Sequence, residues 1–155
     1  MAQVHVIVNP ASRDGRCGKA WPDVRRRMEN DGWTVEAFIT GGPGDAARHA
    51  HHLVTAGHVG QGDLVVAVGG DGVVHEVASG LRGSGAVLGQ IPFGSGNDFA
   101  ITHGIPRDDL EGALRLLKEG VDRPSGAWRL EAFPAPPESA EYPVQANPWD
   151  GPAEE

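Results

Sequence analysis

The segment that most constrains the fold is a run of apolar residues that ends in three glycines around an aspartate. Residues 64–68 are all apolar, Gly69, Gly70 and Gly72 follow with Asp71 among them, and apolar residues then recur at helical spacing. This pattern predicts a buried strand, a tight turn and a helix. Glycines let the backbone approach an anion closely, and the first turn of a helix offers unpaired N–H groups. The turn is therefore predicted to bind phosphate.

Asp71 is unexpected in an anion site, because an unpaired carboxylate repels phosphate. Its presence indicates either a bound divalent cation or a base directed at an acceptor hydroxyl. The alternative is a structural role, in which Asp71 caps the helix that follows the turn. The spacing of the first turn alone leaves both interpretations open.

A second glycine turn follows another short apolar strand. Residues 86–91 resemble the first apolar run, and residues 92–100 continue as Pro-Phe-Gly-Ser-Gly-Asn-Asp-Phe-Ala. Two such turns at the ends of neighbouring parallel strands would face one crevice, and ligands of open α/β sheets bind in that position. The asparagine and second aspartate of this turn are also good helix caps.

Strands and helices alternate along the first 119 residues. We expect strands over residues 4–8, 34–40, 64–68 and 87–91. We expect helices over residues 18–30, 45–57, 73–81 and 108–119, with Asp45 capping the second of them, and a short helix starting at Asn97 and Asp98. This order predicts an α/β fold in which a parallel sheet carries helices on both faces.

Three motifs together resemble one family. Asn9-Pro10-Ala11-Ser12, the first turn with Glu76, and the second turn occur in the order and approximate spacing of the diacylglycerol kinase catalytic domain. That family also includes sphingosine and ceramide kinases and bacterial lipid kinases. The resemblance extends from Val4 to about Arg123, so we expect residues 1–123 to form a nucleotide-binding domain.

The resemblance implies an ATP-dependent kinase that uses Mg²⁺ and phosphorylates a lipid alcohol, such as diacylglycerol or a sphingoid base. It makes Asp71 the candidate base or magnesium ligand, in agreement with the charge argument above. The other residues predicted to contact the nucleotide are Asn9, Ser12, Lys19, Thr40, Gly69, Gly70, Gly72, Glu76, Gly94, Ser95, Gly96, Asn97 and Asp98. Glu76 is expected to organise the loop by accepting backbone N–H groups. Val73 departs from the family pattern, where many members have a threonine.

Three other interpretations stay open. NAD kinases also use a Gly-Gly-Asp-Gly turn, although the second turn is more similar to that of the lipid kinases. The chain could bind ATP without catalysing a reaction. It could also be a remnant of a longer enzyme, because the family's C-terminal β-rich domain, which supplies part of the acceptor site, is absent from this sequence.

Residues 124–155 differ in composition from the rest of the chain. They hold seven of the twelve prolines and six acidic residues against one basic residue. Such a composition is typical of a disordered tail, and a truncated start of the second domain is the alternative.

The overall charge and hydropathy limit the partners. The net charge of −8 over 155 residues gives no basic surface for nucleic acid. No apolar run approaches the length of a membrane span. We therefore expect a cytoplasmic protein that meets its lipid at a membrane surface; the sequence does not indicate an oligomeric state.

Overall fold

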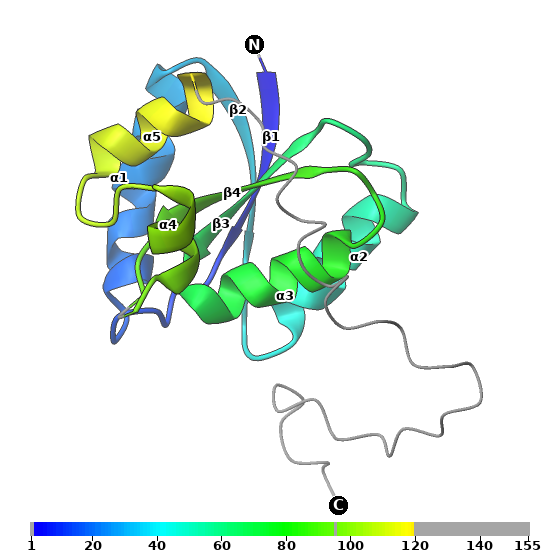
Figure 1. The fold of residues 1–155 in the computed structure, drawn as a ribbon, viewed down its shortest axis with the longest axis horizontal. Coiled ribbons are helices and arrows are strands. Elements are labelled where there is room, and N and C mark those ends of the chain that lie inside the picture. Colours follow the sequence, from blue (N-terminus) through cyan, green and yellow to red (C-terminus); the bar gives the residue numbers. More distant parts are fainter. Residues whose placement is uncertain (1, 95, 120–155) are drawn as a thin grey trace, which may run out of the picture. The chain divides into compact units, whose positions relative to one another are not determined.

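The computed structural model describes residues 2–94 and 96–119. They form a four-stranded sheet and five helices, seen in Figure 1. In chain order the elements are β1 (Ala2–Val8), α1 (Arg16–Asn30), β2 (Trp33–Ile39), α2 (Asp45–Thr55), β3 (Leu64–Gly69), α3 (Asp71–Leu81), β4 (Val87–Pro92), α4 (Asp98–His103) and α5 (Leu110–Glu119).

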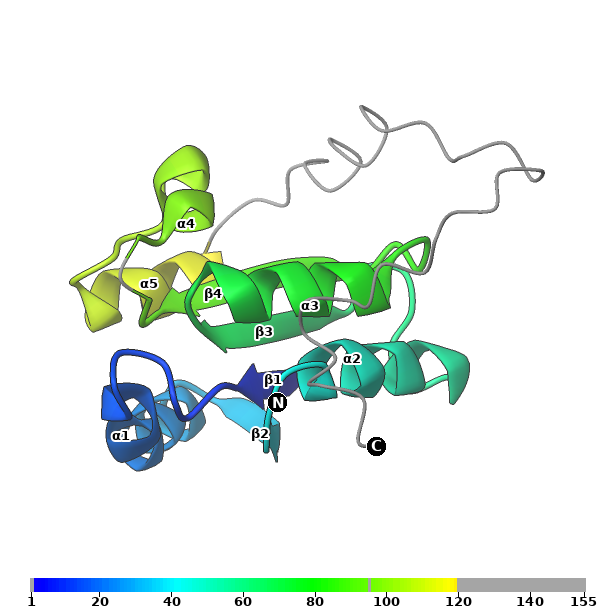
Figure 2. The same cartoon turned by 90° about the horizontal axis from the view of Figure 1, so that it is seen from below.

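All neighbouring strands in the sheet are parallel, in the order β2-β1-β3-β4. The order can be followed across the sheet in Figure 2. The chain moves from β1 outward to β2 and then returns past β1 to β3, so the topology reverses between β1 and β3. In open α/β sheets a crevice forms at such a reversal, beyond the carboxyl ends of the strands.

Helices cover both faces of the sheet. Figure 1 shows α1 and α5 on one face and α2 and α3 on the other. An apolar core lies between each pair of helices and the sheet. Val66 and Val68 of β3 point into the first core, while Val65 and Ala67 point into the second. This alternation buries both faces of the strand. The predicted α/β architecture is confirmed.

Several predicted boundaries need correction. Helix α1 begins at Arg16 rather than Gly18, and α3 begins at Asp71 rather than Val73. Asp45 does not cap α2, because Gly44 holds the capping position. The Asp45 carboxylate instead accepts the N–H of Gly41 at 2.7 Å. A hydrogen bond from Arg48, followed by that of Gly41, lowers the pKa of Asp45.

The prediction for residues 124–155 lies outside the described residues. Within the described part, no helix is both long and apolar enough to span a membrane.

Helices α2 and α3 approach each other closely at Gly80. A Cβ atom on this residue would lie 2.5 Å from the Ala47 carbonyl oxygen and 2.6 Å from the Ala50 Cβ. The two backbones can therefore pack at this distance only because Gly80 has no side chain.

We predict that Gly80→Ala lowers the free energy of unfolding by about 1–3 kcal/mol, because the added methyl group forces the helices apart. Alanine is the better helix former, so a loss of stability would show that the interhelical contact outweighs helix propensity. Urea unfolding followed by circular dichroism measures the change. Gly42→Ala is the control, since nothing lies within 4 Å of its Cβ position. Equal stabilities for the two variants would contradict the prediction.

Candidate functional site

The two glycine turns are in backbone contact. A Cβ atom on Gly70 would lie 2.8 Å from the Gly94 Cα, and a Cβ on Gly94 would lie closer still to the Gly70 Cα. Parallel pairing of β3 with β4 brings the turns together, because Gly69 and Pro92 are the last partners in the register. The two turns therefore lie side by side at the ends of neighbouring strands; that they face one ligand crevice stays a prediction.

The first glycine turn leaves backbone N–H groups at the start of α3 without acceptors among the described residues. Helix α3 has no side-chain cap, and among the described residues no acceptor bonds the N–H groups of Asp71, Gly72 or Val73. These three groups belong to the first turn of an 11-residue helix, whose dipole favours negative charge there. The geometry is suited to an anionic group such as a phosphate.

Asp71 connects the first turn to the second. Its carboxylate accepts the backbone N–H groups of Asp98 and Phe99 at 2.9 Å and 3.1 Å, at the start of α4. The hypothesis that Asp71 caps its own helix is therefore wrong, because Gly70 occupies that position. A carboxylate has about four acceptor positions, so these two bonds leave capacity for another partner.

Asn97 shapes the second turn. Its amide oxygen accepts the N–H of Gly94 at 2.9 Å, and its amide nitrogen donates to the Gly94 carbonyl at 2.6 Å. Asn97 has a φ of 54° and is buried. Its side chain thus closes the turn, and a contact with nucleotide stays a prediction. Ser95, between the two, lies outside the described residues.

A second group of predicted residues meets at the reversal between β1 and β3. A Cβ atom on Gly69 would lie 2.9 Å from the Ser12 Oγ and 3.4 Å from the Asn9 Cβ. Gly69 has a φ of +151°, which residues with a side chain rarely adopt. The Asn9 Oδ1 accepts the N–H of Ala11 at 3.2 Å and so helps to shape the loop that carries Ser12. Asn9 and Ser12 therefore lie at the first glycine turn, and their predicted contact with a nucleotide stays a prediction.

Gly96 lies beside the carboxylates of the site. Its Cβ position is 3.5 Å from an oxygen of Asp71 and 3.9 Å from an oxygen of Asp98. Both of these carboxylates therefore lie near the backbone of the second turn at Gly96.

Three predicted residues are less closely tied to the turns. Lys19 is exposed on α1 and forms no ion pair with a described residue. Thr40 follows β2 and is buried, with its N–H donating to the Val8 carbonyl at 2.9 Å. Glu76 accepts no backbone N–H from the described residues, contrary to expectation, and its Oε1 is buried without a hydrogen-bond partner among them.

Gln90 was not among the residues predicted for the site. This residue is 1% exposed in β4, and its Nε2 donates to the Gly69 carbonyl at 3.1 Å. The one indication in the sequence was that a polar residue stands inside an otherwise apolar strand. Its partner lies 21 positions away and could not be identified from spacing.

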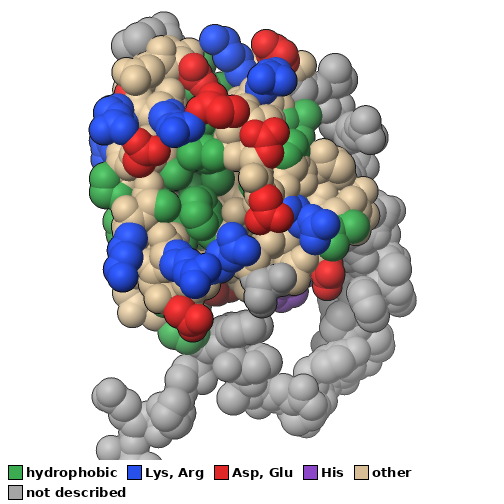
Figure 3. Space-filling view, turned by 90° about the vertical axis from the view of Figure 1, so that its left-hand side faces the viewer, with side chains coloured by type: hydrophobic (Ala, Val, Ile, Leu, Met, Phe, Trp, Pro, Cys, Tyr) green, Lys and Arg blue, Asp and Glu red, His purple; other side chains and the backbone are tan. Residues whose placement is uncertain are grey.

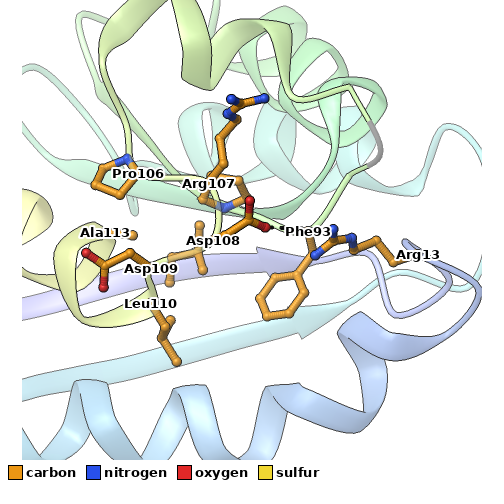
Figure 4. Close-up of a pocket in the computed structure, with 10 residues that line it drawn as sticks. Arg13, Phe93, Pro106, Arg107, Asp108, Asp109, Leu110 and Ala113 are labelled. Carbon is orange, nitrogen blue, oxygen red and sulfur yellow. Dashed lines mark ion pairs between the residues drawn. The ribbon is translucent and has the colours of Figure 1, made fainter.

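A separate cavity of about 230 Å³ lies on the side of the sheet that carries α1 and α5. Figure 3 shows this face, with hydrophobic side chains in a hollow between charged groups. Arg13 and Asp108 approach to 3.8 Å over it, as the dashed line in Figure 4 marks. None of the predicted nucleotide residues lines the cavity. We therefore place the candidate site at the glycine turns, where free donors and carboxylates converge.

Burial controls the other reactive groups. It raises the pKa of the Cys17 thiol to about 11, so this cysteine stays protonated at neutral pH. Burial also lowers the pKa values of His5 and His49.

Within the described residues, no three His, Cys, Asp or Glu side chains are arranged to hold a metal ion.

Residues 3–128 match the diacylglycerol kinase catalytic domain. The chain belongs to this family. It is 35% identical over 126 residues to a diacylglycerol kinase of Bacillus subtilis, covering 80% of this chain and 40% of that protein. It is 32% identical over 120 residues to a diacylglycerol kinase of Staphylococcus aureus, covering 76% of this chain and 36% of that protein.

A solved structure supports the same assignment. The crystal structure of a diacylglycerol kinase from Bacillus anthracis superposes with a TM-score of 0.62 at 28% identity, covering 76% of this chain and 40% of that one. The chain thus spans about 40% of the length of these relatives.

We predict that Gly94→Ala lowers the free energy of unfolding by about 1–3 kcal/mol, because the new methyl group would collide with the Gly70 backbone. Gly96→Ala is the matched control in the same turn, since its nearest neighbour would be at an ordinary contact distance of 3.5 Å. Thermal unfolding of both variants measures the difference. A Gly94→Ala protein as stable as Gly96→Ala would show that the turns do not depend on this contact.

Proposed function

We propose that this chain binds ATP at the two glycine turns and takes part in transferring its terminal phosphoryl group to the hydroxyl of a lipid alcohol. The observation that carries the proposal is the uncapped N-terminus of α3, held against the second turn by the contact of Gly70 with Gly94. Membership of the diacylglycerol kinase catalytic domain family supports the reaction class.

Phosphoryl transfer depends on positioned phosphates and an oriented hydroxyl far more than on covalent catalysis by the protein. In the proposed complex, the N–H groups of Gly72 and Val73 bind phosphate oxygens. Asn9 and Ser12 lie beside the first turn and would contact the nucleotide from the β1 side.

Asp71 is the proposed base for the acceptor hydroxyl. Two backbone N–H groups fix its carboxylate, and the remaining lone pairs can accept a proton or bind a cation. Mg²⁺ in phosphoryl-transfer sites is held by one or two carboxylates together with substrate phosphates, so Asp71 with Asp98 nearby fits that ion. When bound, Mg²⁺ would offset the negative charge between carboxylate and phosphate.

The acceptor belongs to the lipid alcohols, as the names of the relatives indicate for those proteins. We place the reaction at a membrane surface on the cytoplasmic side, where such an acceptor is available. Diacylglycerol is the first candidate, because the relatives that match the chain over most of its length carry that name.

The decisive test has two parts. Calorimetry with ATP and Mg²⁺ measures binding, and radiolabelled ATP with diacylglycerol in mixed micelles measures phosphoryl transfer. We expect both binding and labelled lipid. Binding without labelled lipid would favour the alternative of an ATP-binding module, and a folded chain that releases no heat with millimolar ATP would contradict the proposal.

We predict that Asp71→Asn reduces turnover by about two to four orders of magnitude, the usual contribution of a general base. ATP affinity should change little, and without Mg²⁺ it should rise because a negative charge near the phosphates is lost. An asparagine has one amide oxygen, so it can replace only one of the two bonds to α4. The variant should therefore also lose about 1–3 kcal/mol of stability.

Asp63→Asn is the control for that experiment. Asp63 also accepts a backbone N–H, that of Gly60 at 2.9 Å, but it lies at the other end of β3. This variant should retain full turnover. Unchanged lipid phosphorylation in Asp71→Asn would remove Asp71 from the mechanism.

A further inference from the structure

The carbonyl of Gly69 accepts two hydrogen bonds. The N–H of Phe93 donates to it at 2.9 Å, as the last bond between β3 and β4, and the Nε2 of Gln90 donates at 3.1 Å. The Phe93 bond alone satisfies this buried oxygen. The bond from Gln90 adds a second constraint on its direction.

The orientation of this carbonyl determines where the next N–H group points. In a trans peptide, the Gly69 carbonyl and the Gly70 N–H point in opposite directions. One donor, Gln90, belongs to β4 and the other, Phe93, directly follows it. The Gly70 N–H therefore points away from β4, toward the loop after β1 that carries Asn9 and Ser12. A peptide between two glycines is otherwise the least restricted kind in a chain.

Stability does not explain the presence of Gln90. Its Oε1 is buried and has no hydrogen-bond partner among the described residues. An unsatisfied buried oxygen destabilises a fold, and an apolar side chain of similar volume would avoid that cost. The glutamine is thus better explained by what its amide nitrogen does to Gly69.

We propose that Gln90 is a positioning residue, which fixes the Gly69–Gly70 peptide so that the Gly70 N–H is directed at the phosphate site. The inference rests on the proposed function for the identity of the anion, ATP phosphate. The hydrogen-bonded geometry of the peptide is independent of that function and can be measured without nucleotide.

The test compares Gln90→Leu and Gln90→Met, which keep the volume but cannot donate, with wild type. Gln3→Leu is the matched control, because Gln3 is exposed at the opposite end of the sheet. In the ATP-free protein, the amide resonance of Gly70 should shift in both Gln90 variants and stay in place in the control. The melting temperatures of Gln90→Leu and Gln90→Met should equal or exceed that of wild type. Calorimetry should show ATP affinity reduced about tenfold, the effect of a misdirected hydrogen bond of ordinary strength.

The outcomes separate this inference from the proposed function. Wild type that binds no ATP contradicts the function, and the Gly70 resonance then decides the inference. An unshifted resonance overturns the inference, as does equal ATP affinity in wild type and both Gln90 variants. A large fall in melting temperature in both variants would also overturn it, because Gln90 would then serve the stability of the core.

Discussion

The candidate site depends on one contact between two stretches of bare backbone. Gly70 and Gly94 pack so closely that neither position has room for a Cβ atom. Each turn ends a different strand, and this contact joins them into one surface. The carboxylate of Asp71 then reaches the start of α4, and the amide of Asn97 closes the second turn around Gly94.

The parallel sheet makes that contact possible. Parallel register aligns the carboxyl ends of β3 and β4, so the two turns leave the sheet at the same edge. The reversal of topology between β1 and β3 adds the loop that carries Asn9 and Ser12. The fold thus brings uncapped helix donors and carboxylates to one edge of the sheet, an arrangement that suits phosphoryl transfer. The chain matches about 40% of the length of these relatives.

Local patterns in the sequence were enough to predict the strands, most of the helices and the position of both turns. They did not predict where α1 begins, because Arg13 and Asp14 adopt left-handed conformations that are uncommon for residues with side chains. Asp71 bonds the backbone of Asp98, 27 positions away, and Gln90 bonds that of Gly69, 21 positions away. Neither role could therefore be predicted from neighbouring residues. Glu76 was assigned backbone donors that the described structure does not provide.

The central claim is that the joined glycine turns bind phosphate, and amide chemical shifts in a titration with ATP and Mg²⁺ test it most directly. The account predicts that the largest shifts occur at residues 70–73 and 94–98, with smaller ones at Asn9 and Ser12. Amides at the opposite end of the sheet, such as those of Gln3 and Asp63, should not move. Shifts confined to the cavity beneath Arg13 and Asp108, with none at the glycine turns, would contradict the account.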